Sequence, residues 1–180
     1  MRILVIGAAG CGKTTLASEI AKQFGLRHLD SDEYYWEKTN PPFQLKRPYD
    51  VRTSEIWTDF LRDQKVVVSG SMVTWGEQWK HAFDFGIFLL VPQKARMKRL
   101  HQREEKRYGK QLYTNKKIRE NSREFLEWAE SYDDPNISHG ISKQLTWLKL
   151  VTFPVLNIEG DFSVSEYLQK IKSYMDVTFK

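Results

Sequence analysis

Hydrophobic residues gather along this chain in short runs that are not interrupted by polar residues. In the first run, Ile3–Ile6, every residue is apolar, and we expect the strand to begin at Arg2. A strand that is apolar on both faces is typical of a parallel sheet covered by helices on both sides. Runs rich in Val, Leu, Ile or Phe predict four further strands, at 27–29, 65–69, 85–91 and 153–158.

Between these runs, apolar residues recur with helical spacing. Leu16, Ile20 and Phe24 fall on one face of a helix, and Gly25 follows where a helix would end. Further helices are predicted at 50–64, 93–107, 115–132 and 141–151, and a last one starts at Ser163. This alternation predicts a three-layer α/β fold with a parallel sheet of about five strands. The segment Trp36–Tyr49 has three prolines and no periodicity, so we expect a long ordered loop.

Length and charge narrow the classes of protein. With 180 residues we expect a single domain over 1–180 with a substantial core. The net charge of +5 is consistent either with binding to nucleic acid or with a binding site for polyanionic nucleotides. The single cysteine, Cys11, excludes a disulfide framework and a Cys-rich metal site. Because no apolar run is long enough for a membrane span and the first strand starts at Arg2, we expect a cytoplasmic protein without a membrane partner.

The segment from Gly7 to Thr14 has the spacing G-x-x-x-x-G-K-T between a predicted strand and a predicted helix. This is the phosphate-binding loop of nucleotide-binding proteins, in which backbone N–H groups converge on phosphates. We expect Lys13 to reach the β- and γ-phosphates of ATP and Thr14 to bind Mg²⁺. The residues expected to bind the nucleotide are Gly7, Ala8, Ala9, Gly10, Cys11, Gly12, Lys13, Thr14 and Thr15.

Two aspartates, Asp30 and Asp32, follow the short second strand. The carboxyl edge of a parallel sheet is where open α/β folds bind ligands, beside the phosphate-binding loop. Carboxylates there suit Mg²⁺ water molecules or the hydroxyl of an attacking substrate. Either aspartate alone has a second interpretation, as the N-cap of the next helix.

The segment 94–110 predicts a basic helix with four arginines within about 80° of one another, at Arg96, Arg99, Arg103 and Arg107. Beside a nucleotide, such guanidinium groups bind phosphates and neutralise charge that develops during transfer. The alternative is a solvated basic face or a strip that docks nucleic acid. We expect this arginine region to span about 94–115 and an acceptor-binding region, near Arg47 of the proline-containing loop, to span about 32–64.

The chain resembles the P-loop kinases of small molecules, which include adenylate, shikimate and gluconate kinases. The loop "GAAGCGKTTLA" matches theirs, and "LDSDEYY" resembles the shikimate kinase segment in which paired aspartates touch Mg²⁺ and the substrate hydroxyl. The Arg99–Arg107 segment is similar to the start of their arginine-bearing lid. A bacterial family labelled AAA-type ATPase or adenylate-kinase-like is more similar still, through "DSDEYYW", "PPFQLKRP", "VVVSGSMVTWG", "RLHQREEKRYG" and "FLEWAESYDD".

The chain also departs from these relatives. Many of them have an aspartate at the end of the third strand, where this chain has Ser69 and Ser71, so metal binding would rest on Thr14 and Asp32. The Asp-Gly-aromatic-Pro-Arg signature of nucleoside monophosphate kinases is missing. The sequence Thr114–Lys117 lacks the aspartate of a guanine-binding motif, which disfavours a GTPase.

These features together predict an ATP-dependent kinase with a small-molecule acceptor. The predicted catalytic residues are Lys13, Asp32, Arg103 and Arg107, and the predicted substrate-binding residues are Asp30, Asp32, Arg47 and Arg99. The predicted metal ligands are Thr14 and Asp32, with ATP and Mg²⁺ as cofactors. Alternatives are a nucleoside or nucleoside monophosphate kinase, and a regulatory ATP-binding protein that recognises nucleic acid through the basic helix.

Overall fold

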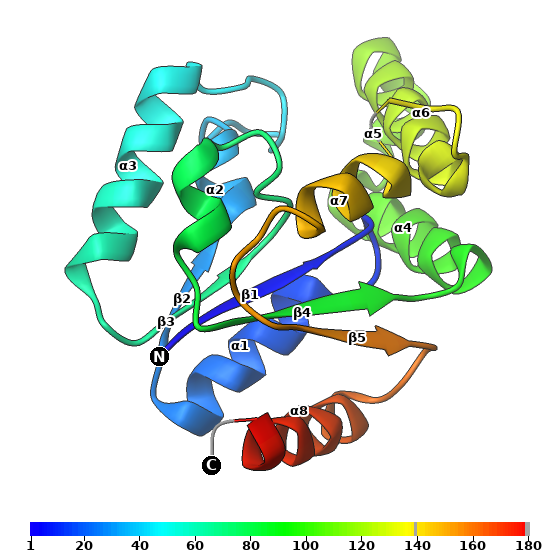
Figure 1. The fold of residues 1–180 in the computed structure, drawn as a ribbon. Coiled ribbons are helices and arrows are strands. Elements are labelled where there is room, and N and C mark those ends of the chain that lie inside the picture. The colour runs from blue at the N-terminus through cyan, green and yellow to red at the C-terminus, as the bar shows by residue number, and fades with distance from the viewer. Residues whose placement is uncertain (139, 179–180) are drawn as a thin grey trace.

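The computed structural model describes residues 1–138 and 140–178. Within these residues, five parallel strands form one sheet in the order β2-β3-β1-β4-β5 (Figure 1). The strands are β1 (Arg2–Gly7), β2 (Arg27–Asp30), β3 (Val66–Ser69), β4 (Phe85–Leu90) and β5 (Val155–Glu159). The predicted α/β fold with a parallel sheet of about five strands is confirmed.

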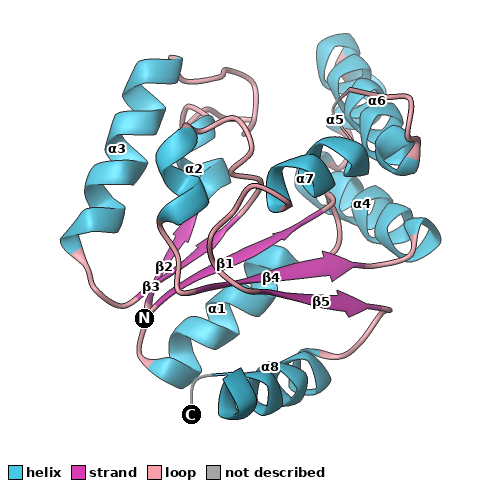
Figure 2. Cartoon of the chain, in the orientation of Figure 1, coloured by secondary structure: helices cyan, strands magenta, loops and turns pink. Residues whose placement is uncertain are grey.

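Helices cover both faces of the sheet, as the colouring by secondary structure shows (Figure 2). On one face lie α1 (Lys13–Phe24) and α8 (Val164–Thr178), and on the other lie α3 (Tyr49–Arg62) and α7 (Ile141–Leu148). The second face also carries the short helix η1 (Glu77–His81). The three predicted layers are therefore present.

Strand β1 explains why the apolar runs do not alternate. Ile3 and Val5 pack in the cluster that contains α1, whereas Leu4 and Ile6 pack in the cluster that contains α3. Successive side chains of a strand point to opposite faces, so a central strand between two helical layers must be apolar throughout. All four of these side chains are fully buried.

A group of helices lies at the carboxyl end of the sheet, on the side to which the arrow of β4 points (Figure 1). It consists of α4 (Gln93–Tyr108), α5 (Gln111–Thr114) and α6 (Lys116–Glu130), which is followed by the single turn η2 (Ser131–Asp133). The short helix α2 (Ser31–Tyr35) follows β2 directly. Two segments from distant parts of the sequence thus flank the phosphate-binding loop.

The predicted boundaries are close to those observed, with a few differences. The helix predicted at 141–151 ends at Leu148, and the strand predicted at 153–158 begins at Val155. The short elements α2, α5, η1 and η2 were not predicted, because five residues or fewer are too few to show a helical period. The loop predicted at Trp36–Tyr49 has no helix or strand between α2 and α3, apart from a single bridge between Trp36 and Lys46.

Candidate active site

The loop between β1 and α1 has the geometry of an anion-binding site. Gly10 and Gly12 have φ angles of 77° and 92°, a left-handed conformation that favours glycine. A Cβ atom on Gly10 would lie 2.7 Å from the backbone oxygen of Arg96, so no larger residue fits there. Helix α1 begins at Lys13 without a side-chain cap, which leaves its first N–H groups available to an anion.

Lys13 lies across this loop. Its Nζ atom donates a hydrogen bond of 2.7 Å to the backbone oxygen of Ala8. Thr14 and Thr15, the next residues of α1, are exposed, whereas Cys11 is buried in the core cluster behind the loop. The loop therefore presents a lysine and two hydroxyl groups at the carboxyl end of β1.

The structure separates the two aspartates that follow β2. Asp30 is the N-cap of α2, and its carboxylate accepts a hydrogen bond of 3.1 Å from the backbone N–H of Asp32. The side chain of Asp32 is accessible to water, although protein atoms surround part of it. This partial desolvation, and then the charge of Asp30, raise the pKa of the Asp32 carboxyl, while Lys13, Arg103 and Arg107 act to lower it. Asp32 is therefore the aspartate in the field of the predicted catalytic cations.

Replacing Asp30 with alanine is expected to lower the free energy of unfolding by about 1 kcal/mol, because the cap of α2 is lost. Asp30→Asn should retain most of the stability, since an asparagine side chain also caps helices. Urea denaturation of both variants measures the difference. An unchanged stability of Asp30→Ala would mean that this cap contributes nothing to folding.

The four arginines of α4 do not form one stripe. Arg96 is buried and donates to the backbone oxygen of Val91 and to Asp133. The interpretation of all four arginines as one clamp is therefore wrong for Arg96, whose role in this arrangement is to join α4 to η2. Its partners come from outside α4, which is why helical periodicity alone did not single it out.

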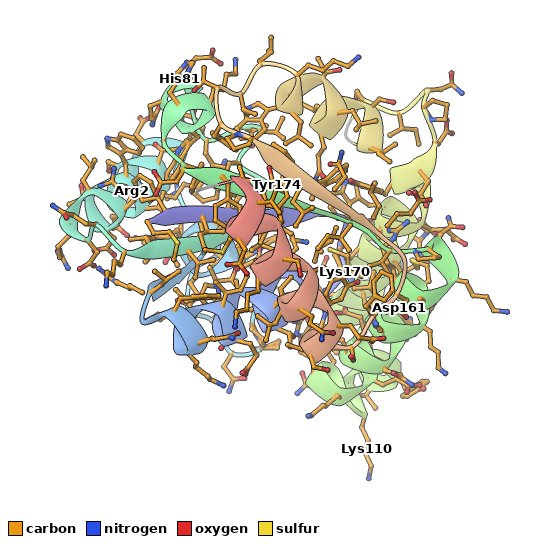
Figure 3. All side chains as sticks on the ribbon, turned by 60° about the horizontal axis from the view of Figure 1, so that its bottom comes forward. Arg2, His81, Lys110, Asp161, Lys170 and Tyr174 are labelled. Atoms are coloured by element: carbon orange, nitrogen blue, oxygen red, sulfur yellow. The ribbon has the colours of Figure 1, made fainter. Side chains whose placement is uncertain are left out.

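Arg99 lies on the outer side of the phosphate-binding loop. It donates hydrogen bonds to the backbone oxygen of Gly10 and to the carboxylate of Asp161. Asp161 lies in the loop before α8 (Figure 3). An open groove of about 620 Å³ runs beside this pair, lined by Pro92, Lys94, Ala95, Lys98, Arg99, Gln102 and Asp161. Arg99 therefore lies next to the loop itself.

Arg47 lies on the other flank, at the end of the loop that precedes α3. Its guanidinium forms an ion pair of 2.7 Å with Glu55 of α3 and lies 3.9 Å from Glu37. These two carboxylates raise the pKa of Arg47, the first through a direct hydrogen bond. Arg47 and Arg99 are thus held by separate partners on separate elements.

Arg103 and Arg107 lie on the part of α4 that faces Asp32. Arg103 is exposed to water, but partial desolvation by the surrounding protein, and then the charge of Arg107, lower its pKa, while Glu104 and Asp32 act in the opposite direction. Arg107 forms an ion pair of 3.0 Å with Glu104, whereas Arg103 has no ion pair among the residues that the structure describes. Its guanidinium lies 5.4 Å from the centre of the Phe125 ring. An unpaired guanidinium beside a second one favours an anionic ligand.

Two charged residues of this region were not singled out from the sequence. Glu104 is buried, and it accepts hydrogen bonds from Arg107 and from Ser122 of α6. The guanidinium of Arg52, on α3, lies 4.1 Å from the centre of the Tyr35 ring, and its Nε atom is buried without a hydrogen-bond partner in the described residues. Both lie in ordinary charged stretches of helix, so no local signal distinguishes them.

The end of β3, where many relatives have an aspartate, contains a different contact. The hydroxyl of Ser69 lies 2.9 Å from Nε2 of His28 on the neighbouring strand β2. Burial lowers the pKa of His28. The sequence of β3 is VVVS, so this strand has no carboxylate to offer to the loop.

The donors at the loop fit Mg²⁺ together with a nucleotide. In residues 1–138 and 140–178, no group of three or more His, Cys, Asp or Glu side chains could hold a metal ion by itself. Magnesium in phosphoryl-transfer sites uses one or two protein oxygens, with water and phosphate oxygens as its other ligands. The exposed hydroxyl of Thr14 and the carboxylate of Asp32 are oxygen donors of this kind.

Solved structures with the same arrangement of helices and strands identify the fold. Shikimate kinase from Bacteroides thetaiotaomicron has the same fold, with a TM-score of 0.60 at 18% identity over 98% of this chain and 99% of that one. Shikimate kinase from Acinetobacter baumannii, solved with shikimate, has a TM-score of 0.53 at 18% identity over 96% and 93%. With its phosphate-binding loop and five-stranded parallel sheet, this chain therefore has the P-loop kinase fold.

Sequence comparison identifies the particular family. A profile of the AAA domain family matches residues 3–127. The chain is also 35% identical over 176 residues to the uncharacterized protein YqaC of Bacillus subtilis (strain 168), with 96% of each chain covered. The chain therefore belongs to the AAA domain family. Across the described residues, no helix combines the length and apolar character that crossing a membrane requires.

Proposed function

We propose that this protein transfers the γ-phosphoryl group of ATP to a hydroxyl or phosphate oxygen of a small acceptor. The observation that carries the proposal is the gathering of three cations, Lys13, Arg103 and Arg107, in the field of the Asp32 carboxylate. Phosphoryl transfer depends mainly on positioning and on stabilising charge on the transferred group. Three cations and an aligning carboxylate beside a phosphate-binding loop support that chemistry.

In the proposed reaction, the acceptor oxygen forms a bond to the γ-phosphorus while the bond to the bridging oxygen of ADP breaks. Lys13 and the N–H groups of the loop hold the β- and γ-phosphates, and Arg103 and Arg107 bind the charge on the transferred group. Asp32 aligns the acceptor and takes its proton, either directly or through water. Mg²⁺, held by Thr14 and Asp32, would supply charge neutralisation between the phosphates.

The two flanks of the loop divide the work in this proposal. The region 94–115 would close over the phosphates, and the region 32–64 would bind the acceptor. Asp30, Arg47 and Arg99 are the further residues predicted to bind the substrate. The position of Arg99 beside Gly10 favours contact with the nucleotide over contact with the acceptor. Arg52, whose Nε atom is buried without a hydrogen-bond partner in the described part of the chain, is a further candidate for the acceptor side.

The experiment that tests the proposal is a screen of ATP consumption across small metabolites, nucleosides and nucleoside monophosphates. An acceptor-dependent release of ADP supports the proposal, and the acceptor class separates a metabolite kinase from a nucleoside kinase.

The exposed lysines Lys94 and Lys98 of α4 favour a second candidate, a nucleotide-dependent protein that binds nucleic acid. Salt-sensitive binding to DNA or RNA without acceptor-dependent turnover would favour it.

Replacing Asp32 with asparagine is expected to lower kcat at least ~10²-fold and to leave nucleotide binding intact. The amide has the shape of the carboxylate but neither accepts the proton nor binds Mg²⁺ as an anion. Nucleotide affinity measured by calorimetry and turnover with the acceptor found in the screen test this prediction. Asp176→Asn, on the exposed face of α8, is the control with no expected effect. Normal turnover of Asp32→Asn would refute the proposed role of Asp32.

A further inference from the structure

The loop of residues 36–48, between α2 and α3, is fastened to the arginine-bearing helices. Its base is closed by backbone hydrogen bonds of 2.8 Å from Glu37 to Leu45 and of 2.9 Å from Arg47 to Tyr35. Its tip accepts a hydrogen bond of 3.1 Å at the backbone oxygen of Pro42 from the hydroxyl of Tyr108, at the end of α4. The segment of the proposed acceptor side is thus in direct contact with the helix of the proposed catalytic arginines.

A second contact joins the tip to α6. The side-chain amide of Asn121 donates a hydrogen bond of 3.2 Å to the side-chain oxygen of Gln44. Because Pro42 and Gln44 flank Phe43, both neighbours of Phe43 contact the helical group, Pro42 through its backbone oxygen and Gln44 through its side chain.

Phe43 has a backbone conformation that bulky residues rarely adopt. Its φ angle is 64°, and it is the only non-glycine residue with a positive φ in the described part of the chain. Such a conformation is strained and persists only where the surroundings hold it, often at functional sites. Here the guanidinium of Arg107 lies 4.1 Å from the centre of the Phe43 ring.

Arg107 is therefore held from two sides. Its Nη1 atom donates a hydrogen bond of 3.0 Å to Glu104, whose other oxygen accepts one of 2.8 Å from Ser122. The carboxylate fixes the edge of the guanidinium, and the ring of Phe43 lies against it. A guanidinium with a fixed edge and a covered face retains little rotational freedom, which is what transition-state stabilisation by a preorganised charge requires.

We propose that Phe43 is a positioning residue that orients Arg107 toward the transferred phosphoryl group and so links the acceptor side of the site to α4. The proposal rests on the proposed function, since it assigns Arg107 to the transferred group. When an acceptor binds without moving loop 36–48, Glu104 and Phe43 both keep their contacts with Arg107. An acceptor that displaces the loop leaves Arg107 in contact with Glu104 but not with Phe43. Transfer of the phosphoryl group to such an acceptor is slow. The loop thus contributes to specificity through kcat.

Replacing Phe43 with leucine removes the aromatic face but keeps an apolar side chain. The expected result is a kcat lower by about 3- to 30-fold, the range of a cation–π contact, with the KM for MgATP little changed. Phe43→Tyr keeps the ring and should restore kcat. Turnover of Phe43→Leu equal to the unmodified protein would overturn the proposal. A higher turnover would also overturn it, because the ring would then be holding Arg107 away from its place.

A double-mutant cycle separates a role through Arg107 from a general loss of structure. In the background of Arg107→Lys, Phe43→Leu should lower kcat no further, and two independent losses would overturn the link between the residues. A second cycle, built from Phe43→Leu and Arg107→Met and measured by urea denaturation, should show non-additive shifts of the midpoint. Additive shifts would refute the ring–guanidinium contact even if no acceptor is found. Absence of turnover by the unmodified protein would refute the proposed function instead.

Discussion

Replacing Lys13 with alanine is expected to abolish phosphoryl transfer. No other side chain of the phosphate-binding loop carries a positive charge, and Nζ of Lys13 lies inside the loop, 2.7 Å from the backbone oxygen of Ala8. A cation at this place bridges the β- and γ-phosphates and stabilises the charge that moves between them. Turnover with the acceptor from the screen and calorimetric titration with MgATP measure the effect, and MgATP affinity should fall as well.

The matched control for this variant is Lys22→Ala, at the exposed end of the same helix. Lys22 forms an ion pair with Glu19 and lies away from the loop, so its removal should leave turnover unchanged. Thermal unfolding of both variants shows whether α1 is intact. Turnover of Lys13→Ala close to that of the unmodified protein would refute the assignment of the loop as the nucleotide site.

Replacing Arg103 with lysine is expected to lower kcat by ~10³-fold or more, while the affinity for ATP changes little. Because lysine keeps the positive charge, the decrease in kcat measures the contribution of the planar, bidentate geometry of the guanidinium. Arg103 is the arginine of α4 without an ion pair among the described residues, which leaves its donors available to the transferred group. We expect a decrease of the same kind for Arg107→Lys. Steady-state kinetics at saturating acceptor measure both variants.

Arg123→Lys provides the control for the same change of residue type. Arg123 lies on the exposed face of α6 and pairs with Glu127, so the substitution should not alter turnover. A loss of nucleic-acid binding in Arg103→Lys with catalysis intact would contradict the kinase interpretation of α4. It would favour the regulatory protein that binds nucleic acid.

The second strand illustrates the limit of local sequence information. The two aspartates after it have the same chemistry and lie two residues apart. From the sequence, each of them could be either the N-cap of a helix or the catalytic carboxylate. Only the direction of the chain at the start of α2 makes Asp30 the cap and leaves Asp32 facing Lys13 and the arginines. The catalytic and binding roles of these residues stay predictions, as do the single-domain assignment and the regions 32–64 and 94–115.

The basic helix shows the same limit. Its period puts Arg96, Arg99, Arg103 and Arg107 close together around the axis, but their functions depend on partners that the helix does not contain. Asp133 and Asp161 come from segments far along the chain, and Phe43 comes from the opposite flank. Helical periodicity carries no information about these partners, and so the four arginines appeared equivalent.

The sequence by itself determined the features whose causes are local. The fold class is predicted by the uninterrupted apolar strands and the helical periods, because these patterns depend on which faces are buried. The nucleotide site is predicted by the spacing of glycines and lysine in the phosphate-binding loop, because that spacing depends on backbone conformation. The tertiary structure decided which charges meet. Asp32 lies in the field of Lys13, Arg103 has no ion pair in residues 1–138 and 140–178, and the Phe43 ring lies against Arg107. These electrostatic and ring contacts join residues that only the folded sheet and helices bring together.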